Sequence, residues 1–266
     1  MIPPLLLEEL RRPDAYPLVV TGAGISLASG IATFRGSDPN AVWSKNVLEK
    51  GTRFYFERDP VGSWSWYLSR FAGSRSAMPN PAHYALGGIE RKLLERGAKF
   101  MLVTQNVDGL HLAAGSQNVV EIHGAARKVR CSSSPMVGCP NGEPEGFLLW
   151  DDAMFAAFRE DPCKQNLPVC PMCGDLLRPH VLWFDESYSD HEDYGLDKLV
   201  PEVEKFTLML FVGTSFSVGI TDMLTQIGTE GGIAMFTVDP TAEGPDWFYK
   251  VPEKAEEFLP ALAATL

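Results

Sequence analysis

The sequence has little basic charge, no long apolar run and no cysteine outside one segment. Its 23 basic and 34 acidic residues give a net charge of −11, which disfavours nucleic acid and anionic membranes as partners, because phosphate groups attract clustered cations. No uninterrupted apolar stretch approaches the ~18 residues that argue for a membrane span. The first apolar run has no basic leader, and acidic residues follow it where a signal peptide would carry a cleavage site. We therefore expect a soluble, cytoplasmic protein.

The cysteines point to a metal site rather than to disulfides. All five fall between positions 131 and 173, and an odd number without a secretory signal argues against a disulfide framework. Cys170 and Cys173 form a C-x-x-C knuckle, whose thiolates can occupy two vertices of a tetrahedral zinc site. Cys131 and Cys139 are their natural complement, and Cys163 could substitute for one of them. A closed four-cysteine site is structural, since it leaves no open position for substrate, whereas a redox dithiol is the alternative for the C-x-x-C pair.

The order of apolar runs and helical patterns predicts an α/β fold. Four short apolar runs each end in a polar or glycine-rich loop, which is typical of buried parallel strands. These runs are residues 18–21, 100–103, 208–212 and 233–238, and helical patterns occupy residues 82–96, 222–227 and 252–262. Strands that alternate with helices predict a Rossmann-like, doubly wound parallel sheet.

Two segments do not follow this alternation, and we interpret both as insertions that form a smaller lobe. Residues 38–79 are rich in aromatic residues and helix formers, and residues 127–176 hold every cysteine. The smaller lobe would combine a helical insertion with a zinc-binding insertion, within a single unit of residues 1–266. The large domain would consist of residues 1–37, 80–126 and 177–266.

A glycine-rich loop after the first apolar run is a candidate phosphate-binding turn. Gly22, Ala23 and Gly24 lie just before Ser26, and glycines allow the backbone to approach a pyrophosphate closely. Leu27 stands where the dinucleotide fingerprint has its third glycine, which disfavours an ordinary hydride-transferring dehydrogenase. A tight strand-to-helix turn without a ligand is the alternative.

A dense polar cluster follows the second apolar run. The segment T-Q-N-V-D-G-L-H places Gln105, Asn106 and Asp108 at a predicted strand end, where open α/β sheets bind ligands. Paired donors and acceptors suit a carboxamide, whereas an Asx turn that bonds only its own backbone is the alternative.

His123 is the candidate general base. It follows an apolar run, precedes Gly124 and lies just before the cysteine-rich segment. Histidine titrates near neutral pH and can take a proton from a hydroxyl, although a lone histidine is more often a hydrogen-bonded structural residue.

Taken together, these motifs resemble the sirtuins, a family of NAD-dependent protein lysine deacylases. The matching motifs lie in the family's order and cover nearly the whole chain. They are G-A-G-I-S at residues 22–26, S-G-I-A-T-F-R-G at 29–36, P-N-P-A-H at 79–83, T-Q-N-V-D-G-L-H at 104–111, E-I-H-G at 121–124, the cysteine pairs, L-R-P-H-V-L-W-F-D-E at 177–186 and V-G-T-S-F-S-V at 212–218.

The resemblance implies a reaction with NAD as co-substrate. The carbonyl oxygen of an acyl-lysine would attack C1′ of the nicotinamide ribose, so that nicotinamide leaves and an alkylimidate forms. The later products would be free lysine and O-acyl-ADP-ribose. The implied partners are acyl-lysine proteins or peptides, with no nucleic acid and no membrane, and a monomer is compatible with the sequence.

The resemblance also implies roles for individual residues. His123 would activate the ribose hydroxyls, while Asn106 and Asp108, also catalytic, would hold the nicotinamide carboxamide. The other implied cofactor-binding residues are Gly22, Ala23, Gly24, Ser26, Phe34, Arg35, Gln105, Gly213, Thr214, Ser215 and Asp239. Phe34 would shield the cationic sugar from water.

Substrate and metal contacts follow from the same comparison. Residues 181–186 would pair with the substrate backbone by strand addition, which recognises a peptide through its main chain. The implied contacts there are Val181, Trp183, Phe184 and Glu186. One structural zinc ion would be bound by Cys131, Cys139, Cys170 and Cys173.

Two departures from the family pattern bear on the acyl group. Ala32 and Thr33 replace the proline and aspartate that usually precede F-R-G, and the threonine resembles a branch associated with acidic acyl groups. That branch also has Y-x-x-R in its acyl pocket, which Tyr67 and Arg70 match. A guanidinium can hold a carboxylate in a bidentate fork, with the tyrosine hydroxyl as a further donor. An ordinary helix turn, which places residues i and i+3 on one face, is the alternative.

Other departures affect the groove and the adenosine site. Asp185 replaces a usual glycine and would add negative charge beside the substrate groove, favouring basic peptides or disfavouring an acidic acyl group. Asp239 stands where asparagine commonly meets the adenosine ribose, and a carboxylate can still accept from a ribose hydroxyl. The family's cofactor contact near the C-terminus has no clear match around Lys250 and Val251.

The leading hypothesis is therefore an NAD-dependent lysine deacylase that prefers succinyl or malonyl groups. A plain deacetylase is the first alternative. The altered residues Ala32, Thr33 and Asp185 motivate a second one, an NAD glycohydrolase or ADP-ribosyltransferase. A catalytically silent NAD-binding module is the third.

Overall fold

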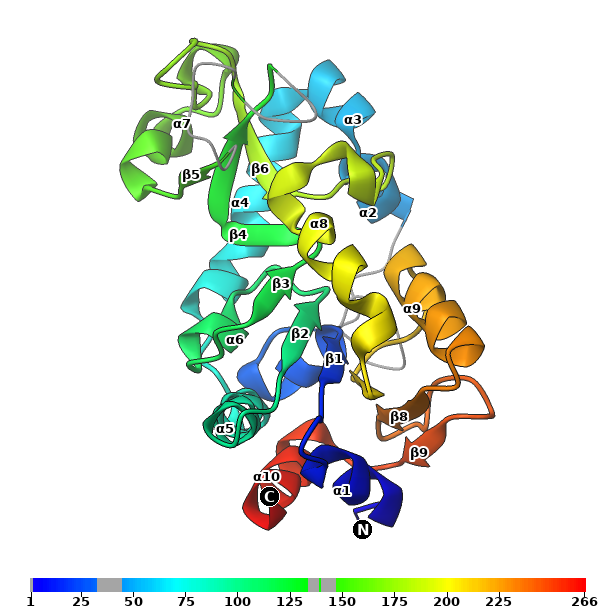
Figure 1. Ribbon diagram of the computed structural model, residues 1–266. Helices are drawn as coiled ribbons and strands as arrows, with labels where there is room; N and C mark the ends of the chain where they lie inside the picture. The colour runs from blue at the N-terminus through cyan, green and yellow to red at the C-terminus, as the bar shows by residue number, and fades with distance from the viewer. Residues whose placement is uncertain (1, 33–44, 134–138, 140–146) are drawn as a thin grey trace.

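The structure is a computed structural model that describes residues 2–32, 45–133, 139 and 147–266 (Figure 1). Its larger part is a six-stranded parallel sheet in the order β3-β2-β1-β7-β8-β9. Its strands are β1 (Pro17–Thr21), β2 (Met101–Thr104), β3 (Val119–Glu121), β7 (Leu208–Val212), β8 (Ala234–Val238) and β9 (Tyr249–Val251). The chain proceeds from β1 to β3 on one side and from β7 to β9 on the other, so the strand order reverses between β1 and β7. Doubly wound sheets bind ligands at the carboxyl ends of two such strands.

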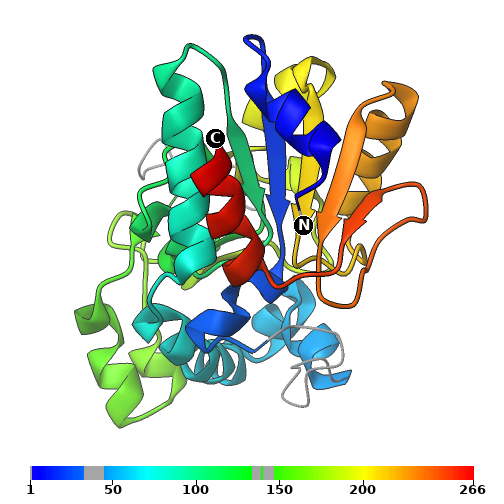
Figure 2. The same ribbon diagram turned by 90° about the horizontal axis from the view of Figure 1, so that it is seen from below.

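The central strands are apolar on both sides, because helices cover both faces of the sheet. In β1, Val19 packs into one core, whereas Leu18 and Val20 pack into the other. The first core is covered by α1 (Pro4–Arg11), α5 (Pro81–Glu95) and α10 (Ala255–Thr265). In Figure 2, α5 and α10 lie side by side. The second core is covered by α8 (Leu196–Leu199), η6 (Val200–Lys205) and α9 (Gly219–Glu230).

A second, antiparallel sheet in the order β5-β4-β6 belongs to the smaller lobe. Its strands are β4 (Gly124–Cys131), β5 (Leu148–Leu149) and β6 (Leu177–Val181). The helix α4 (Pro60–Ser76) packs against β4 and β6, and its fully buried Trp64 donates its indole N–H to the Leu177 carbonyl at 2.8 Å. This helix therefore joins the helical insertion to the cysteine-bearing sheet.

The remaining elements are short. They are the helices α2 (Lys45–Lys50), α3 (Arg53–Arg58), α6 (Leu110–Ala113) and α7 (Ala156–Glu160), and the 3-10 helices η1 (Ala23–Ser29), η2 (Asp152–Phe155), η3 (Lys164–Asn166), η4 (Tyr188–Asp190) and η5 (Glu192–Tyr194). Among the described residues, no helix is both long enough and apolar enough to cross a membrane.

The predicted fold class is confirmed, since a parallel sheet lies between helices and a smaller lobe carries the clustered cysteines. The four predicted strands correspond to β1, β2, β7 and β8. The edge strands β3 and β9 were not predicted, because three residues are too few for a periodic pattern. The domain boundaries stay a prediction; β6, which starts at residue 177, pairs with β4 in the smaller sheet.

Candidate functional site

The loops after β1 and β7 touch each other where the strand order reverses. The Gly24 amide donates to the Gly213 carbonyl at 2.9 Å. A Cβ on Gly22 would lie 2.6 Å from the Gly213 oxygen, and one on Gly24 would lie 2.8 Å from the Gly213 Cα. Gly213 itself has φ +58°, a conformation that favours glycine. Side chains are therefore excluded from the contact between the two loops. This contact lies at the edge of the sheet where such folds bind ligands.

The polar cluster after β2 bonds to the loop after β1. The side-chain amide of Asn106 donates to the Gly22 carbonyl and to Ser26 Oγ, each at 3.1 Å. Ser26 in turn donates its hydroxyl to Asp108 Oδ2 at 2.7 Å. Burial raises the pKa of Asp108, although hydrogen bonds from Leu110 and Ser26 counteract part of that rise. Three polar side chains from two loops thus form one connected group.

The Asx turn that we considered as the alternative for this segment is also present. Asp108 Oδ1 accepts from the Leu110 amide, two residues further on, at 2.9 Å. The other carboxylate oxygen accepts from Ser26, so the turn accounts for only one of the two oxygens of Asp108.

Gln105 connects three parts of the site. Its amide N–H donates to the Thr21 carbonyl at 2.9 Å, and its side chain donates to Thr214 Oγ1 at 3.1 Å. Its own carbonyl lies 2.9 Å from Nδ1 of His123. Gln105 therefore connects the loops after β1, β2 and β7 to the candidate base.

The protonation of His123 follows from its partners. A carbonyl only accepts hydrogen bonds, so the bond to Gln105 places the ring hydrogen on Nδ1 and leaves a lone pair on Nε2. Burial lowers the pKa of His123 to about 4, although the bond to Gln105 works in the opposite direction. The imidazole is thus neutral at pH 7, as a general base must be. Its Nε2 lies 2.9 Å from the hydroxyl of Tyr188.

Two further histidines lie behind the glycine loop. His111 Nε2 is 3.0 Å from Thr21 Oγ1, and His83 Nε2 is 3.5 Å from Ser26 Oγ. Burial lowers the pKa of His83 to about 4 and that of His111 to about 3. Both are neutral hydrogen-bonding partners of the loop.

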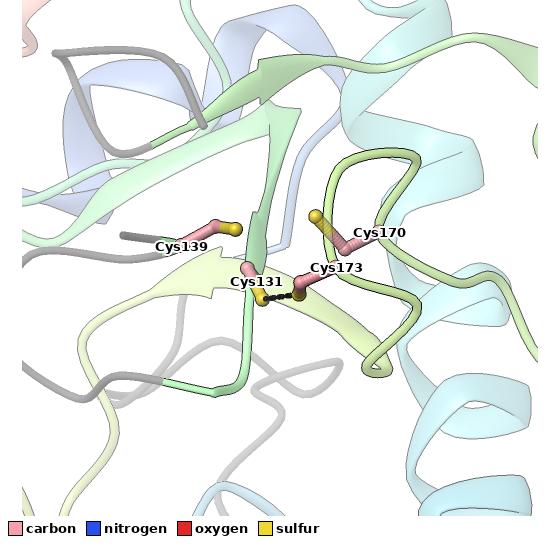
Figure 3. A group of neighbouring side chains, drawn as sticks. All are labelled: Cys131, Cys139, Cys170 and Cys173. Atoms are coloured by element: carbon pink, nitrogen blue, oxygen red, sulfur yellow. Dashed lines mark hydrogen bonds between the residues drawn. The ribbon is translucent and has the colours of Figure 1, made fainter. Parts of the chain in front are cut away.

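Four cysteine sulfurs lie close together in the smaller lobe (Figure 3). The sulfurs of Cys131, Cys139, Cys170 and Cys173 are all within 4.8 Å of one another. A tetrahedral zinc site with Zn–S bonds near 2.3 Å needs sulfurs about 3.8 Å apart, so a small adjustment would place all four around one ion. Cys163 is not in the group, and its thiol instead lies 3.4 Å from an oxygen of Asp161. Four thiolates match a closed, structural zinc site.

The segment of residues 181–186 leaves β6 and passes beside His123. The Leu182 amide donates to the His123 carbonyl at 3.0 Å. Trp183 is buried, whereas Phe184 is 48% exposed. Val181, at the end of β6, is half-buried. The candidate peptide-binding segment and the candidate base therefore share a backbone hydrogen bond.

Glu186 anchors this segment within the protein. Its carboxylate accepts from Arg178 at 2.6 and 3.0 Å and from Arg53 at 2.6 Å. Burial raises the pKa of Glu186, but hydrogen bonds from His191 and Arg178 outweigh burial and hold it well below its usual range. Because its oxygens are engaged in this way, Glu186 fixes the segment's shape, and its predicted contact with substrate stays a prediction.

Asp185 caps the start of a helix, and the predicted effect of its charge on the substrate groove stays a prediction. Its two oxygens accept the backbone amides of Arg53 and Phe54, at 2.8 and 3.1 Å, at the start of α3. The positive end of the helix therefore compensates the carboxylate.

The predicted acyl-pocket pair lies on α4. The Tyr67 hydroxyl accepts the indole N–H of Trp183 at 2.9 Å, so it meets the candidate peptide-binding segment. Arg70 lies one turn further on, half-buried, with its guanidinium 5.0 Å from the ring centroid of Trp66. Burial lowers the pKa of Arg70 and Tyr67 works against that shift, but a guanidinium stays charged at neutral pH.

The remaining predicted cofactor-binding residues lie in three places. Ala23 begins η1, Thr214 is buried and Ser215 is exposed, all beside the contact between the two glycine loops. Asp239 follows β8 on the same edge of the sheet, where its Oδ1 accepts from Thr241. Phe34, Arg35 and Thr33 lie outside the described residues.

Comparisons with known proteins agree with this arrangement. A model of the Sir2 family matches residues 22–219. An NAD-dependent protein deacylase of Thermus thermophilus is 40% identical over 235 residues, covering 88% of this chain and 81% of that protein. An NAD-dependent protein deacetylase of Sulfurisphaera tokodaii is 36% identical over 256 residues, covering 96% of this chain and 92% of that protein.

Solved structures are similar over nearly the full length. A Sir2 homologue in complex with NAD has a TM-score of 0.78 and 33% identity, covering 100% of this chain and 94% of that one. A Sir2 structure with a p53 peptide and NAD+ has a TM-score of 0.77 and 26% identity, covering 100% of this chain and 98% of that one.

Proposed function

The chain belongs to the Sir2 family and is an NAD-dependent protein lysine deacylase, and we propose that the acyl groups it removes fastest are acidic ones, succinyl and malonyl. Three relatives carry the general activity in their names. A neighbour solved with a p53 peptide supports acyl-lysine peptides as substrates. The observation that carries the acyl preference is the pair Tyr67 and Arg70, whose tyrosine hydroxyl contacts the candidate peptide-binding segment.

In this proposal NAD lies across the point where the strand order reverses. The diphosphate would lie beside the two glycine loops at Gly22 and Gly213, as it does in other dinucleotide sites. The nicotinamide carboxamide would meet Asn106 and Asp108, whose side chains already form one hydrogen-bonded group with Ser26. The acyl oxygen then attacks C1′ of the ribose, nicotinamide leaves, and an alkylimidate forms.

His123 serves the second half of the reaction. Its neutral ring presents a lone pair on Nε2, while the bond from Nδ1 to Gln105 fixes the tautomer. A ribose hydroxyl that gives its proton to Nε2 becomes a nucleophile toward the alkylimidate. The positive charge that forms on the ring is supported by the Gln105 carbonyl.

The acyl preference rests on charge and geometry around α4. Solvent screens a half-buried cation less than an exposed one, so Arg70 would attract a carboxylate more strongly than an exposed arginine would. Burial raises the pKa of Tyr67, which therefore keeps its proton while it accepts from Trp183. The Tyr67 hydroxyl would therefore be a second hydrogen-bond donor, beside Arg70, to the carboxylate of an acidic acyl group. An acetyl group has no carboxylate for either donor.

A peptide panel tests the preference. Purified protein is incubated with NAD and acetyl-, succinyl- or malonyl-lysine peptides, and products are identified by mass. We expect Arg70→Met to lower kcat/KM for the acidic acyl groups about 10- to 100-fold, the range for losing a charged hydrogen bond. Deacetylation should change little.

Arg75→Met is the matched control on the same helix. Arg75 bonds Asp152 at 2.8 Å on the protein surface, so its loss should alter neither rate. Acetyl removal that is faster than desuccinylation and insensitive to Arg70→Met would contradict the acidic preference and leave plain deacetylation, the activity in the name of the Sulfurisphaera relative. ADP-ribose formed without any acyl peptide would instead support an NAD glycohydrolase.

A further inference from the structure

The candidate base is hydrogen-bonded on its reactive nitrogen by a residue that no motif singles out. The hydroxyl of Tyr188 lies 2.9 Å from His123 Nε2. The two rings are stacked, with centroids 5.7 Å apart and planes inclined by 23°. Tyr188 begins η4, two residues after Glu186 and thus directly beyond the candidate peptide-binding segment.

The direction of this bond is fixed by its neighbours. Because Nδ1 of His123 donates to the Gln105 carbonyl, Nε2 can only accept, and the Tyr188 hydroxyl must be the donor. The phenol oxygen in turn accepts the Ile220 amide at 3.3 Å, near the start of α9. The hydroxyl is therefore oriented from both sides, although its bond to Ile220 is long.

A neutral imidazole nitrogen has one lone pair, so it cannot accept from two hydroxyls at once. The proposed reaction needs that lone pair for a ribose hydroxyl. The bond from Tyr188 and the bond from the ribose are thus mutually exclusive at Nε2. Of the two bonds that hold the tyrosine hydroxyl, the one to His123 at 2.9 Å would be exchanged, and the one to Ile220 is longer, at 3.3 Å.

We propose that Tyr188 caps the base: its hydroxyl occupies the lone pair of His123 Nε2 in the free enzyme, and the ribose hydroxyl of NAD displaces it. The identity of the incoming hydroxyl rests on the proposed function, whereas the cap itself does not depend on any acyl group.

Chemical modification tests the cap without substrate. Diethyl pyrocarbonate attacks unprotonated histidine nitrogen, and modification of His123 can be followed by peptide mass. Tyr188→Phe keeps the ring but removes the hydroxyl, and we expect it to raise the modification rate about three- to tenfold, the range for one hydrogen bond. Tyr16→Phe is the control, since Tyr16 belongs to the same apolar core against which Tyr188 packs. Equal rates in the wild type and Tyr188→Phe would overturn the cap, even if no acyl peptide is turned over.

Steady-state kinetics separates a cap from a residue that only orients the ring. A displaced cap competes with NAD, so Tyr188→Phe should lower the KM for NAD about three- to tenfold without lowering kcat. If Tyr188 only oriented His123, its loss would lower kcat and leave KM unchanged. That result, or no change in either constant, would overturn the proposal.

A measurement on the unaltered protein guards against a variant that does not fold. The nitrogen NMR signal of His123 Nε2 reports its hydrogen-bond partner. We expect this signal to shift when NAD binds, because the donor changes from phenol to ribose hydroxyl. An unchanged signal with NAD bound would show that the lone pair was not exchanged, and would overturn the cap.

Discussion

Asp108 divides its two carboxylate oxygens between two tasks. One oxygen accepts from the Leu110 amide and shapes the turn after β2, and the other accepts from Ser26 and faces the glycine loop. Burial raises the pKa of Asp108, and its hydrogen-bond donors offset part of that rise. The structural interpretation as an Asx turn is therefore observed, while the catalytic role of Asp108 stays a prediction.

Asp108→Asn tests this residue in the first chemical step. An amide keeps an acceptor for Leu110 but loses the charge, so the turn should persist while the site weakens. We expect nicotinamide release to slow about 10- to 100-fold, the range for a lost charged hydrogen bond, with zinc content and melting temperature nearly unchanged. Labelled nicotinamide exchange measures the step.

The control for Asp108→Asn is Asp246→Asn, which removes a fully exposed carboxylate that pairs with Lys250. It should leave exchange at the wild-type rate. Exchange by Asp108→Asn at the wild-type rate would exclude Asp108 from the nicotinamide site.

At the scale of elements, α3 is tied to the candidate peptide-binding segment. Asp185 accepts two amides of α3, the Phe184 amide donates to the Gly51 carbonyl at 2.9 Å, and Arg53 pairs with Glu186. A short helix gains most of its stability from such contacts, because six residues are too few for a stable helix alone. The helical insertion thus positions the candidate peptide-binding segment.

Asp185→Ala should loosen the start of α3. Loss of the two acceptors exposes unpaired amides, and a lost helix cap costs about 1 kcal/mol. We expect the amides of Arg53 and Phe54 to exchange with deuterium faster, which mass spectrometry can follow. Asp185→Asn retains one acceptor, so its exchange rate should lie between those of the wild type and Asp185→Ala. Exchange in Asp185→Ala as slow as in the wild type would mean that the cap contributes nothing.

At the scale of the whole molecule, the two sheets depend on different forces. The parallel sheet is held by apolar cores on both faces. The three-stranded sheet is smaller, and three of the zinc-type cysteines, Cys131, Cys139 and Cys170, belong to its core cluster. A metal ion there would replace part of the stabilisation that a larger core provides.

Removal of zinc should therefore unfold the smaller lobe first. We expect Cys170→Ser to lose the metal and to speed amide exchange in β4 and β6, while β1 and β7 stay protected. Cys163→Ala is the matched control and should retain one zinc per chain, because its thiol lies outside the cluster. Metal analysis and hydrogen exchange measure both. Zinc retained by Cys170→Ser would contradict the four-cysteine site.

Much of the fold and of the site could be predicted because local sequence carries it. The buried strands are short apolar runs that end in glycine or polar residues. Glycine is required at Gly22 and Gly213 because the backbones of the two loops touch there. Tyr188 could not be predicted, because its role depends on a partner 65 positions away in the sequence. The bonds from the start of α3 to Asp185 could not be predicted either, because they are tertiary contacts.

The sequence by itself determined the α/β order, the glycine turns, the set of cysteines and the family, because each depends on residue type and spacing along the chain. Only the tertiary structure decided which cysteine stays outside the cluster, which amides donate to Asp185 and which group occupies the lone pair of His123. The physical reason is that hydrogen bonds and thiolate clusters require atoms within a few ångströms of one another, and that distance is set by packing rather than by sequence separation.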